Sequence, residues 1–260
     1  MTTQGQEVMK PIAIGLAISV ALTGCSSSHK KATPTPSASP VALPTFGPGA
    51  SYHPVINPAD FGPNITNPWL PFTPGTTMIY TGTKDGQPSR DVFTITTATR
   101  VIDGVRCRVV HDSLFLSGKL EEKTIDYYAQ DKAGNVWYFG EDTEELDERG
   151  KVTSREGSWL AGVHGAEPGV FMEADPVVGH RFRQEYYKGH AEDQYTIVDL
   201  DASVTVPYRS FTHALRTEET TSLEPGTLDN KYYVRGVGEV EEITVKGPLE
   251  KAVLVQITRA

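Results

Sequence analysis

The chain has 260 residues, with 24 Lys and Arg against 33 Asp and Glu, which gives a formal net charge of −9. An acidic chain without clustered basic residues argues against nucleic acid as a partner, because binding to phosphates depends on Lys and Arg. The two cysteines, Cys25 and Cys107, are too few for a disulfide framework.

The N-terminal segment has the organisation of an export signal. Lys10 supplies a positive charge, and the apolar run over residues 11–21 is too short to span a membrane. Met9 is a better start for such a signal than Met1, because residues 1–8 are polar and include an acid.

The apolar run ends at Leu22-Thr23-Gly24-Cys25, which resembles the lipobox of bacterial lipoproteins. In that family the cysteine receives a diacylglyceryl group and the chain is cut just before it. The resemblance implies that residues 1–24 are a signal peptide and that Cys25 carries acyl chains such as palmitate. We therefore expect a protein anchored by lipid to the extracytoplasmic face of the cell membrane. The alternative is an ordinary secretory signal with a chance cysteine.

Residues 25–50 combine this cysteine with a stretch rich in Ser, Thr, Pro, Ala and Lys. Large apolar residues are almost missing before Val41, so the stretch cannot bury enough surface to offset the entropy of ordering. We predict a disordered spacer, stiffened by its prolines, between the membrane and the remaining residues.

Residues 51–260 read as a single β-rich domain, long enough to bury its own core. Apolar and polar residues alternate along most of it, and Asp85-Gly86 and Asp103-Gly104 are hairpin turn sequences. No window shows a helical period over three turns. The strands that we predict cover residues 76–83, 91–101, 105–116, 120–130, 136–140, 151–155, 181–187, 194–206, 208–221, 231–245 and 250–259.

The short connections between these strands favour antiparallel pairing, so we predict an all-β, mainly antiparallel meander. Such a sheet must protect its edges, which favours a curved sheet, a half-barrel or a barrel. The Gly-rich segment 158–179 has no clear strand pattern. We predict that it is a loop that either caps an open end or contributes to binding. Cys107 alternates with Val105 and Val109 and should be buried and inert.

Sequence motifs for catalysis are missing. The chain has no Gly-x-Ser-x-Gly, no His-Glu-x-x-His and no phosphate-binding loop. His190 and Glu192 could share a metal, but an exposed hairpin tip explains them better, and the acidic run 141–148 reads as a solvated hairpin. We therefore predict no catalytic residue, no metal ligand and no cofactor. The enzyme alternative is a hydrolase assembled from Glu185, Glu192 and His164.

Aromatic residues occur as adjacent pairs and triples, which places rings on both faces of the sheet. If one face is the core, the other offers an aromatic, partly apolar surface. The ligand-binding residues that we predict are Trp137, Phe139, Trp159, Phe171 and Tyr186. The expected function is a non-catalytic binding module for a lipid, another apolar small molecule or an envelope component. The alternative is a structural or protein-interaction lipoprotein of the cell envelope without a small ligand.

Two resemblances accompany these patterns. Tyr128-Ala129-Gln130-Asp131 and the segment from Gly134 to Glu141 resemble uncharacterised bacterial secreted proteins and lipoproteins. That resemblance implies membership of such a family and no activity. The anchor and the meander are also similar to the half-barrel lipid-carrying lipoproteins of bacterial envelopes, an analogy at the level of the fold.

Overall fold

The computed structural model describes residues 43–260. The predicted signal peptide, Cys25 and the spacer up to residue 42 lie outside the described residues. Strands account for 62% and helices for 3% of the structure, which confirms the all-β prediction. Among residues 43–260, no helix has the length and hydropathy of a membrane span.

Two short 3₁₀ helices lie near the start of the described chain: η1 (Gly49–Ser51) and η2 (Pro58–Asp60). The strands are β1 (Phe61–Gly62), β2 (Thr76–Lys84), β3 (Gln87–Ile102), β4 (Val105–Leu116), β5 (Lys119–Asp131), β6 (Val136–Leu146), β7 (Val152–Ser154), β8 (Trp159–Leu160), β9 (Glu167–Met172), β10 (Arg181–Arg183), β11 (Glu185–Tyr186), β12 (Asp193–Val206), β13 (Arg209–Thr221), β14 (Leu228–Val234), β15 (Gly238–Lys246) and β16 (Lys251–Arg259).

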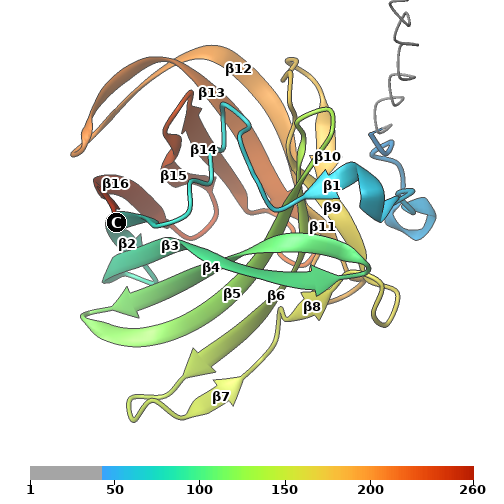
Figure 1. The fold of residues 1–260 in the computed structure, drawn as a ribbon. Helices are drawn as coiled ribbons and strands as arrows, with labels where there is room; N and C mark the ends of the chain where they lie inside the picture. The colour runs from blue at the N-terminus through green and yellow to red at the C-terminus, as the bar shows by residue number, and fades with distance from the viewer. Residues whose placement is uncertain (1–42) are drawn as a thin grey trace, which may run out of the picture. The chain divides into compact units, whose positions relative to one another are not determined.

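The strands form one antiparallel path in the order β10-β12-β13-β14-β15-β16-β2-β3-β4-β5-β6-β9-β11. The two ends of this path, β10 and β11, are consecutive in the chain and separated only by Gln184. The sheet therefore curls into a nearly closed barrel (Figure 1). A Cβ at Gly169 of β9 would collide with the backbone carbonyl of Gln184, so this glycine permits the close approach of strands at the seam.

The hairpin turns explain why the meander could be predicted. Asp85 and Asp103 have φ angles of 52° and 46°, and the glycines that follow them have φ angles of 71° and 77°. Two consecutive residues with positive φ are typical of the tight turn that matches the twist of paired strands. These turns join β2 to β3 and β3 to β4 at the predicted places.

The structure differs from the predicted strands in four places. The predicted strand 181–187 is divided at Gln184 into β10, which pairs with β12, and β11, which pairs with β9. The predicted strand 231–245 is two strands, β14 and β15, with a turn at residues 235–237. The Gly-rich segment 158–179 contains β8 and β9, which pair with β6 and form part of the barrel wall. The acidic run 141–148 continues β6 as far as Leu146. In the last two places, tertiary pairing outweighs composition that is unfavourable for a strand.

Buried side chains form two clusters, a large one that includes Ile95, Val110 and Leu215 and a smaller one that includes Val204 and Leu254. The second cluster lies where the end of β12 folds towards β15 and β16. Cys107 is fully buried, as predicted, and burial raises the pKa of its thiol to about 12.

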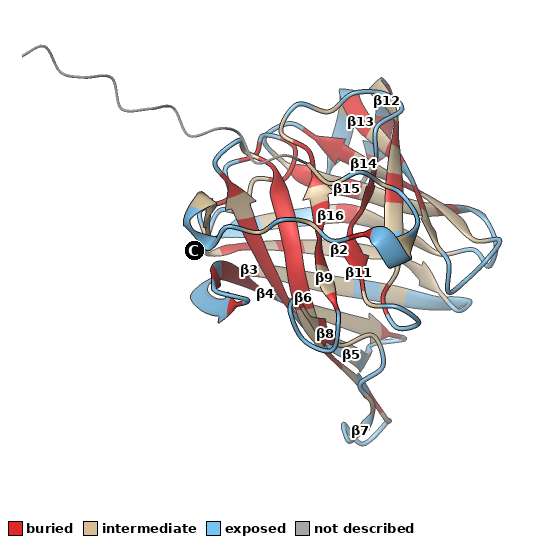
Figure 2. Ribbon diagram, turned by 90° about the vertical axis from the view of Figure 1, so that its right-hand side faces the viewer, coloured by how far each residue is buried: buried red, intermediate tan, exposed pale blue. Residues whose placement is uncertain are grey.

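The residues before β2 cover the outer face of the sheet. Phe61 of β1 packs edge-on against Trp137 and Phe139 of β6, with ring centroids 5.6 and 5.5 Å apart. Phe46 lies against the guanidinium groups of Arg181 and Arg183, and Tyr52 donates a hydrogen bond to the carbonyl oxygen of Pro168 at 3.0 Å. Figure 2 shows the result: β6 is buried along much of its length, whereas the β7 hairpin is exposed.

Candidate functional site

The barrel contains a partly open cavity of about 260 Å³. Its lining comes from eleven barrel strands and from a loop that crosses one end. The lining residues are Leu70, Pro71, Phe72, Met78, Tyr80, Asp91, Phe93, Asp112, Tyr128, Tyr138, Glu141, Phe171, Glu185, Asp193, Lys231, Val237, Gly238, Glu239, Glu242 and Ala252.

Strand alternation determines which residues reach the cavity. On β3 the inward positions include Asp91 and Phe93, and on β4 they include Asp112, because every second side chain points to the same face. On β6, Tyr138 lines the cavity while its neighbours Trp137 and Phe139 face the covered outer side. The strands therefore bring carboxylates and aromatic rings to one surface.

Aromatic rings form one wall of the cavity. Tyr128 and Tyr138 are stacked with centroids 4.6 Å apart, and Phe171 meets both edge-on at 5.2 and 5.7 Å. Phe72 extends the wall towards the loop by packing on Tyr128 at 5.1 Å and on Phe93 at 5.5 Å. Such interlocked rings hold a fixed apolar surface, because each ring restricts the rotation of its neighbours.

The rest of the lining is strongly acidic. It contains a single basic residue, Lys231, and the carboxylates of Asp91, Asp112, Glu141, Glu185, Asp193, Glu239 and Glu242. When these carboxylates are ionised, this imbalance favours positively charged occupants over anions.

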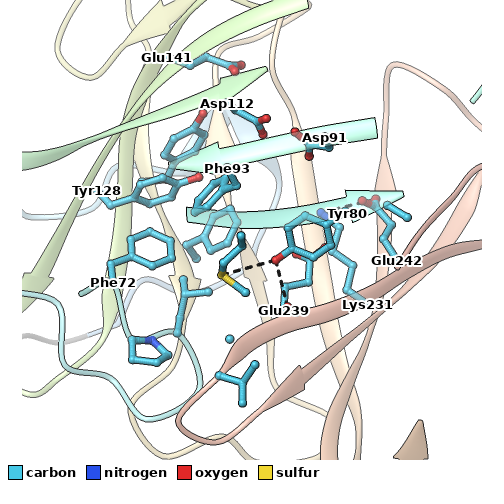
Figure 3. A pocket seen from close by; sticks show the side chains of 18 of the residues that line it. Phe72, Tyr80, Asp91, Phe93, Asp112, Tyr128, Glu141, Lys231, Glu239 and Glu242 are labelled. Atoms are coloured by element: carbon cyan, nitrogen blue, oxygen red, sulfur yellow. Dashed lines mark hydrogen bonds and ion pairs between the residues drawn. The ribbon is translucent and has the colours of Figure 1, made fainter. Parts of the chain in front are cut away.

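Lys231 is already paired with carboxylates. Its Nζ lies 3.3 Å from Oε2 of Glu219 and 3.5 Å from Oε1 of Glu242 (Figure 3 shows Lys231 and Glu242). Burial alone would lower the pKa of Lys231, but the charges of Glu219 and Glu242 raise it well above its usual value. The lysine is therefore a fixed cation that neutralises part of the acidic lining.

Asp91 and Asp112 have no such partner. The Oδ1 atom of each is buried without a hydrogen bond, and both side chains line the cavity (Figure 3). Burial raises the pKa of Asp112 well above its usual range, and both the nearby charge of Asp91 and a side-chain hydrogen bond shared with Asp91 raise it further. Burial likewise raises the pKa of Asp91. The two aspartates therefore form a close pair of carboxyl groups at the pocket, and at least one of them favours its protonated form.

Other carboxylates around the cavity are perturbed in the same direction. Burial raises the pKa values of Glu141 and Glu239 to about 8. Burial also raises the pKa of Asp126 to about 7, although the Tyr138 hydroxyl donates a hydrogen bond to its Oδ1 at 2.6 Å and opposes the shift. These carboxyl groups therefore keep their protons to a higher pH than ordinary carboxyl groups do.

Tyr80 lies in the acidic part of the cavity. Its hydroxyl donates a hydrogen bond to the backbone oxygen of Glu239 at 3.0 Å. In Figure 3 its ring lies between Asp91 and Glu239, on the side of the cavity opposite Tyr128. This bond holds the ring in place at the lining of the cavity.

The loop with Leu70, Pro71 and Phe72 borders one end of the cavity. It is attached to the turn between β14 and β15, because the Gly236 amide donates to the Pro68 carbonyl at 2.7 Å and the guanidinium of Arg235 lies 4.2 Å from the Trp69 ring centroid. Two further cavities of about 190 and 260 Å³ adjoin the first, and Glu242 lines all three. They lead towards Lys84 at the end of β2 and the turn after β13.

Of the five aromatic residues predicted to bind ligand, only Phe171 lines the cavity. Trp137 and Phe139 pack under Phe61 on the other face of β6. Trp159 stands behind the wall: its Nε1 donates to Oε2 of Glu185 at 2.8 Å and its ring meets Tyr138 edge-on. Tyr186 packs on Tyr52 on the outer surface.

The residues of the hydrolase alternative do not form a cluster. Glu185 lines the cavity, but His164 is exposed in a turn and Glu192 accepts the backbone amide of Gly189 at 2.7 Å in another turn. His190 bonds Glu156 through Nδ1 at 2.8 Å. Within residues 43–260, no group of three or more His, Cys, Asp or Glu side chains has an arrangement that could hold a metal ion.

Sequence reasoning did not identify the acidic lining. The sequence feature that could have identified it is the position of single carboxylates on the strands. Asp91 lies two residues from the inward Phe93, and Asp126 lies two residues from the inward Tyr128, so each points to the same face of the sheet as that ring. A charged residue among inward apolar residues is unusual in a strand and points to a cavity or a buried network.

No protein-family model matches the chain, and no curated protein sequence matches it. Two solved structures are similar. One is a candidate exported protein of Bacteroides fragilis with a YmcC-like fold, 15% identical, with a TM-score of 0.42 over 74% of this chain and 99% of the other. The second is a candidate lipoprotein of Parabacteroides distasonis, 12% identical, with a TM-score of 0.38 over 73% of this chain and 98% of the other.

Proposed function

We propose that the protein is a lipid-anchored, extracytoplasmic binding protein that holds a small molecule in the barrel cavity. The observation that carries this proposal is the cavity of about 260 Å³ in the barrel, which has an aromatic wall on one side and a group of carboxyl groups on the other. Ligand sites in proteins are typically concave and largely apolar, with a few polar groups that fix orientation.

The cavity resembles a binding site more than a packing defect. A void left by imperfect packing is small and apolar, because buried polar groups without partners reduce stability. Asp91 and Asp112 nevertheless lie at this cavity with carboxyl oxygens whose charged forms are disfavoured by burial. A bound molecule that contacts these oxygens compensates for part of that cost.

The proposed anchor follows from Leu22-Thr23-Gly24-Cys25. Metabolic labelling with an alkyne fatty acid should mark the wild-type protein and leave Cys25→Ser unmarked. An unmarked wild-type protein would overturn the anchor without affecting the cavity.

Native mass spectrometry tests the binding function. The protein purified from its own membranes should carry a non-covalent small molecule. Ala252 lines the cavity, so Ala252→Phe should fill part of it and remove that mass. Ala98→Phe is the matched control, because Ala98 is exposed on β3. A ligand-free mass in every preparation would favour a structural lipoprotein without a small ligand.

A further inference from the structure

Resting on the proposed function, we propose that the ligand is an organic cation whose ammonium group is held by Asp91, Asp112 and Glu239. Its hydrocarbon part would lie against the aromatic wall at Phe93 and Tyr128. These five residues line the same cavity, and Figure 3 shows the two aspartates directed into the space that Tyr80, Phe93 and Tyr128 surround.

The charge balance of the cavity supports a cation. Lys231, the single basic residue of the lining, is engaged with Glu219 and Glu242. Asp91, Asp112 and Glu239 have no ion pair within the described residues 43–260, so the negative charge that they carry when ionised has no paired cation there. An anionic ligand would add to this excess, whereas a cation would balance it.

Hydrogen bonding supports an ammonium group in particular. The unpartnered atoms at the cavity, Oδ1 of Asp91 and Oδ1 of Asp112, are acceptors when ionised. An ammonium group has several N–H donors and can satisfy both oxygens at once, and charge-assisted bonds of this kind are stronger than neutral ones.

The aromatic rings provide the second part of the recognition. The faces of Phe and Tyr rings attract cations within about 6 Å of the ring centroid. Tyr80 is fixed by its bond to the Glu239 carbonyl, and Phe93 is fixed by Phe72. Carboxylates beside fixed rings favour an amine that also carries an apolar group over an inorganic ion.

Binding of such a cation should release protons. Burial raises the pKa values of Asp91, Asp112 and Glu239, so the empty site holds protons that an incoming positive charge would displace. The other titratable groups that act on these three are Tyr80 and Lys84 of β2, Glu122, Asp126 and Tyr128 of β5, Glu219 of β13, Lys231 and Tyr233 of β14, and Glu242 of β15.

Three probes of similar size test the charge. Phenylethylammonium, 2-phenylethanol and 3-phenylpropionate are titrated calorimetrically into the purified lipoprotein in a non-ionic detergent. The ammonium should bind about 30-fold more tightly than the alcohol, because its bonds to ionised acceptors are stronger. The carboxylate should bind most weakly. Repeating the titration in buffers of different ionisation enthalpy should show proton release with the ammonium alone.

A charge-removing variant locates the effect. Asp91→Asn with Asp112→Asn keeps the shape of both side chains and should reduce ammonium binding to the level of the alcohol, with alcohol binding unchanged. Asp142→Asn is the matched control, because Asp142 pairs with Arg100 and does not line the cavity. The single variants Asp91→Asn and Asp112→Asn should each show a smaller loss and provide the test if the double variant does not fold.

Each remaining outcome overturns the inference. If the alcohol binds as tightly as the ammonium and both are lost in Ala252→Phe, the cavity is a binding site for neutral molecules and the proposed function stands. If none of the probes binds, the organic cation is wrong. The proposed function fails as well only if native mass spectrometry also finds the wild-type protein without a ligand.

Discussion

The Nζ of Lys231 lies 3.3 Å from Oε2 of Glu219, inside the barrel and between strands that are adjacent in the sheet. Both side chains are mostly buried, with 19% and 10% of their surface exposed. The pair keeps a lysine charged in an interior that would otherwise favour its neutral form. The pair also holds Lys231 away from the remaining lining carboxylates, which are then free to contact a ligand.

We predict that Lys231→Met destabilises the protein. The substitution leaves the buried Glu219 carboxylate without its cation, and breaking such a buried pair costs about 3 kcal/mol. Urea unfolding should show this loss, and adding Glu219→Gln should restore part of it. A stability equal to that of the wild type would contradict the role of the pair.

Asp131 organises the turn before β6. Its Oδ1 accepts the amides of Ala133 and Asn135 at 2.9 Å, and its Oδ2 accepts Nε1 of Trp137 at 2.9 Å. We predict that Asp131→Ala costs about 3 kcal/mol in urea unfolding, because several buried donors lose their acceptor. Asp131→Asn should cost less, since an amide oxygen remains. If both variants were as stable as the wild type, the role of Asp131 in stabilising this turn would be contradicted.

The stability of the empty protein should decrease as the pH rises from about 5 to 8. Glu141 and Glu239, with pKa values of about 8 in the folded protein, titrate near 4.3 when unfolded. Between these values the folded state binds more protons, so the free energy of unfolding falls with increasing pH. Thermal unfolding of wild type, Glu141→Gln and Glu239→Gln should show a shallower decline in each variant. Identical slopes would show that these carboxylates titrate normally.

The attachment of the loop at the cavity should control ligand exchange. Arg235→Ala removes the guanidinium that lies over the Trp69 ring, an interaction of about 1 kcal/mol. We expect association and dissociation to become about 5-fold faster, with little change in affinity, in stopped-flow measurements. Arg90→Ala removes a comparable contact over Phe115 and is the matched control. Equal acceleration in both variants would mean that the loop does not limit exchange.

The thiol of Cys107 should not react with a maleimide in the native protein. It is buried and its pKa is raised to about 12, so the reactive thiolate is scarce at neutral pH. Labelling should become complete in urea. Rapid labelling under native conditions would reveal opening of β4.

The barrel could be predicted because its determinants are local. Asp85-Gly86 and Asp103-Gly104 specify hairpins, and alternation along 105–116 specifies β4 to the residue. The closure of the barrel could not be predicted, because it depends on the junction at Gln184 and on the close approach of Gly169, which are contacts between distant segments. β8 and β9 could not be predicted either, because these segments are strands only through their pairing with β6.

The candidate site illustrates a second limit of the sequence. Adjacent rings at Trp137, Tyr138 and Phe139 establish that both faces of β6 are aromatic, but not which face encloses the cavity. That choice depends on Phe61, a residue far away in the chain that covers Trp137 and Phe139. Phe171 was assigned to ligand binding and does line the cavity.

A crystal structure of the lipoprotein purified from its own membranes tests the central claim most directly. The account predicts electron density for a non-protein molecule inside the barrel, in contact with the Asp91 carboxylate and the Phe93 ring. Ordered water alone beside Asp91 and Asp112, or side chains that fill the space, would contradict it.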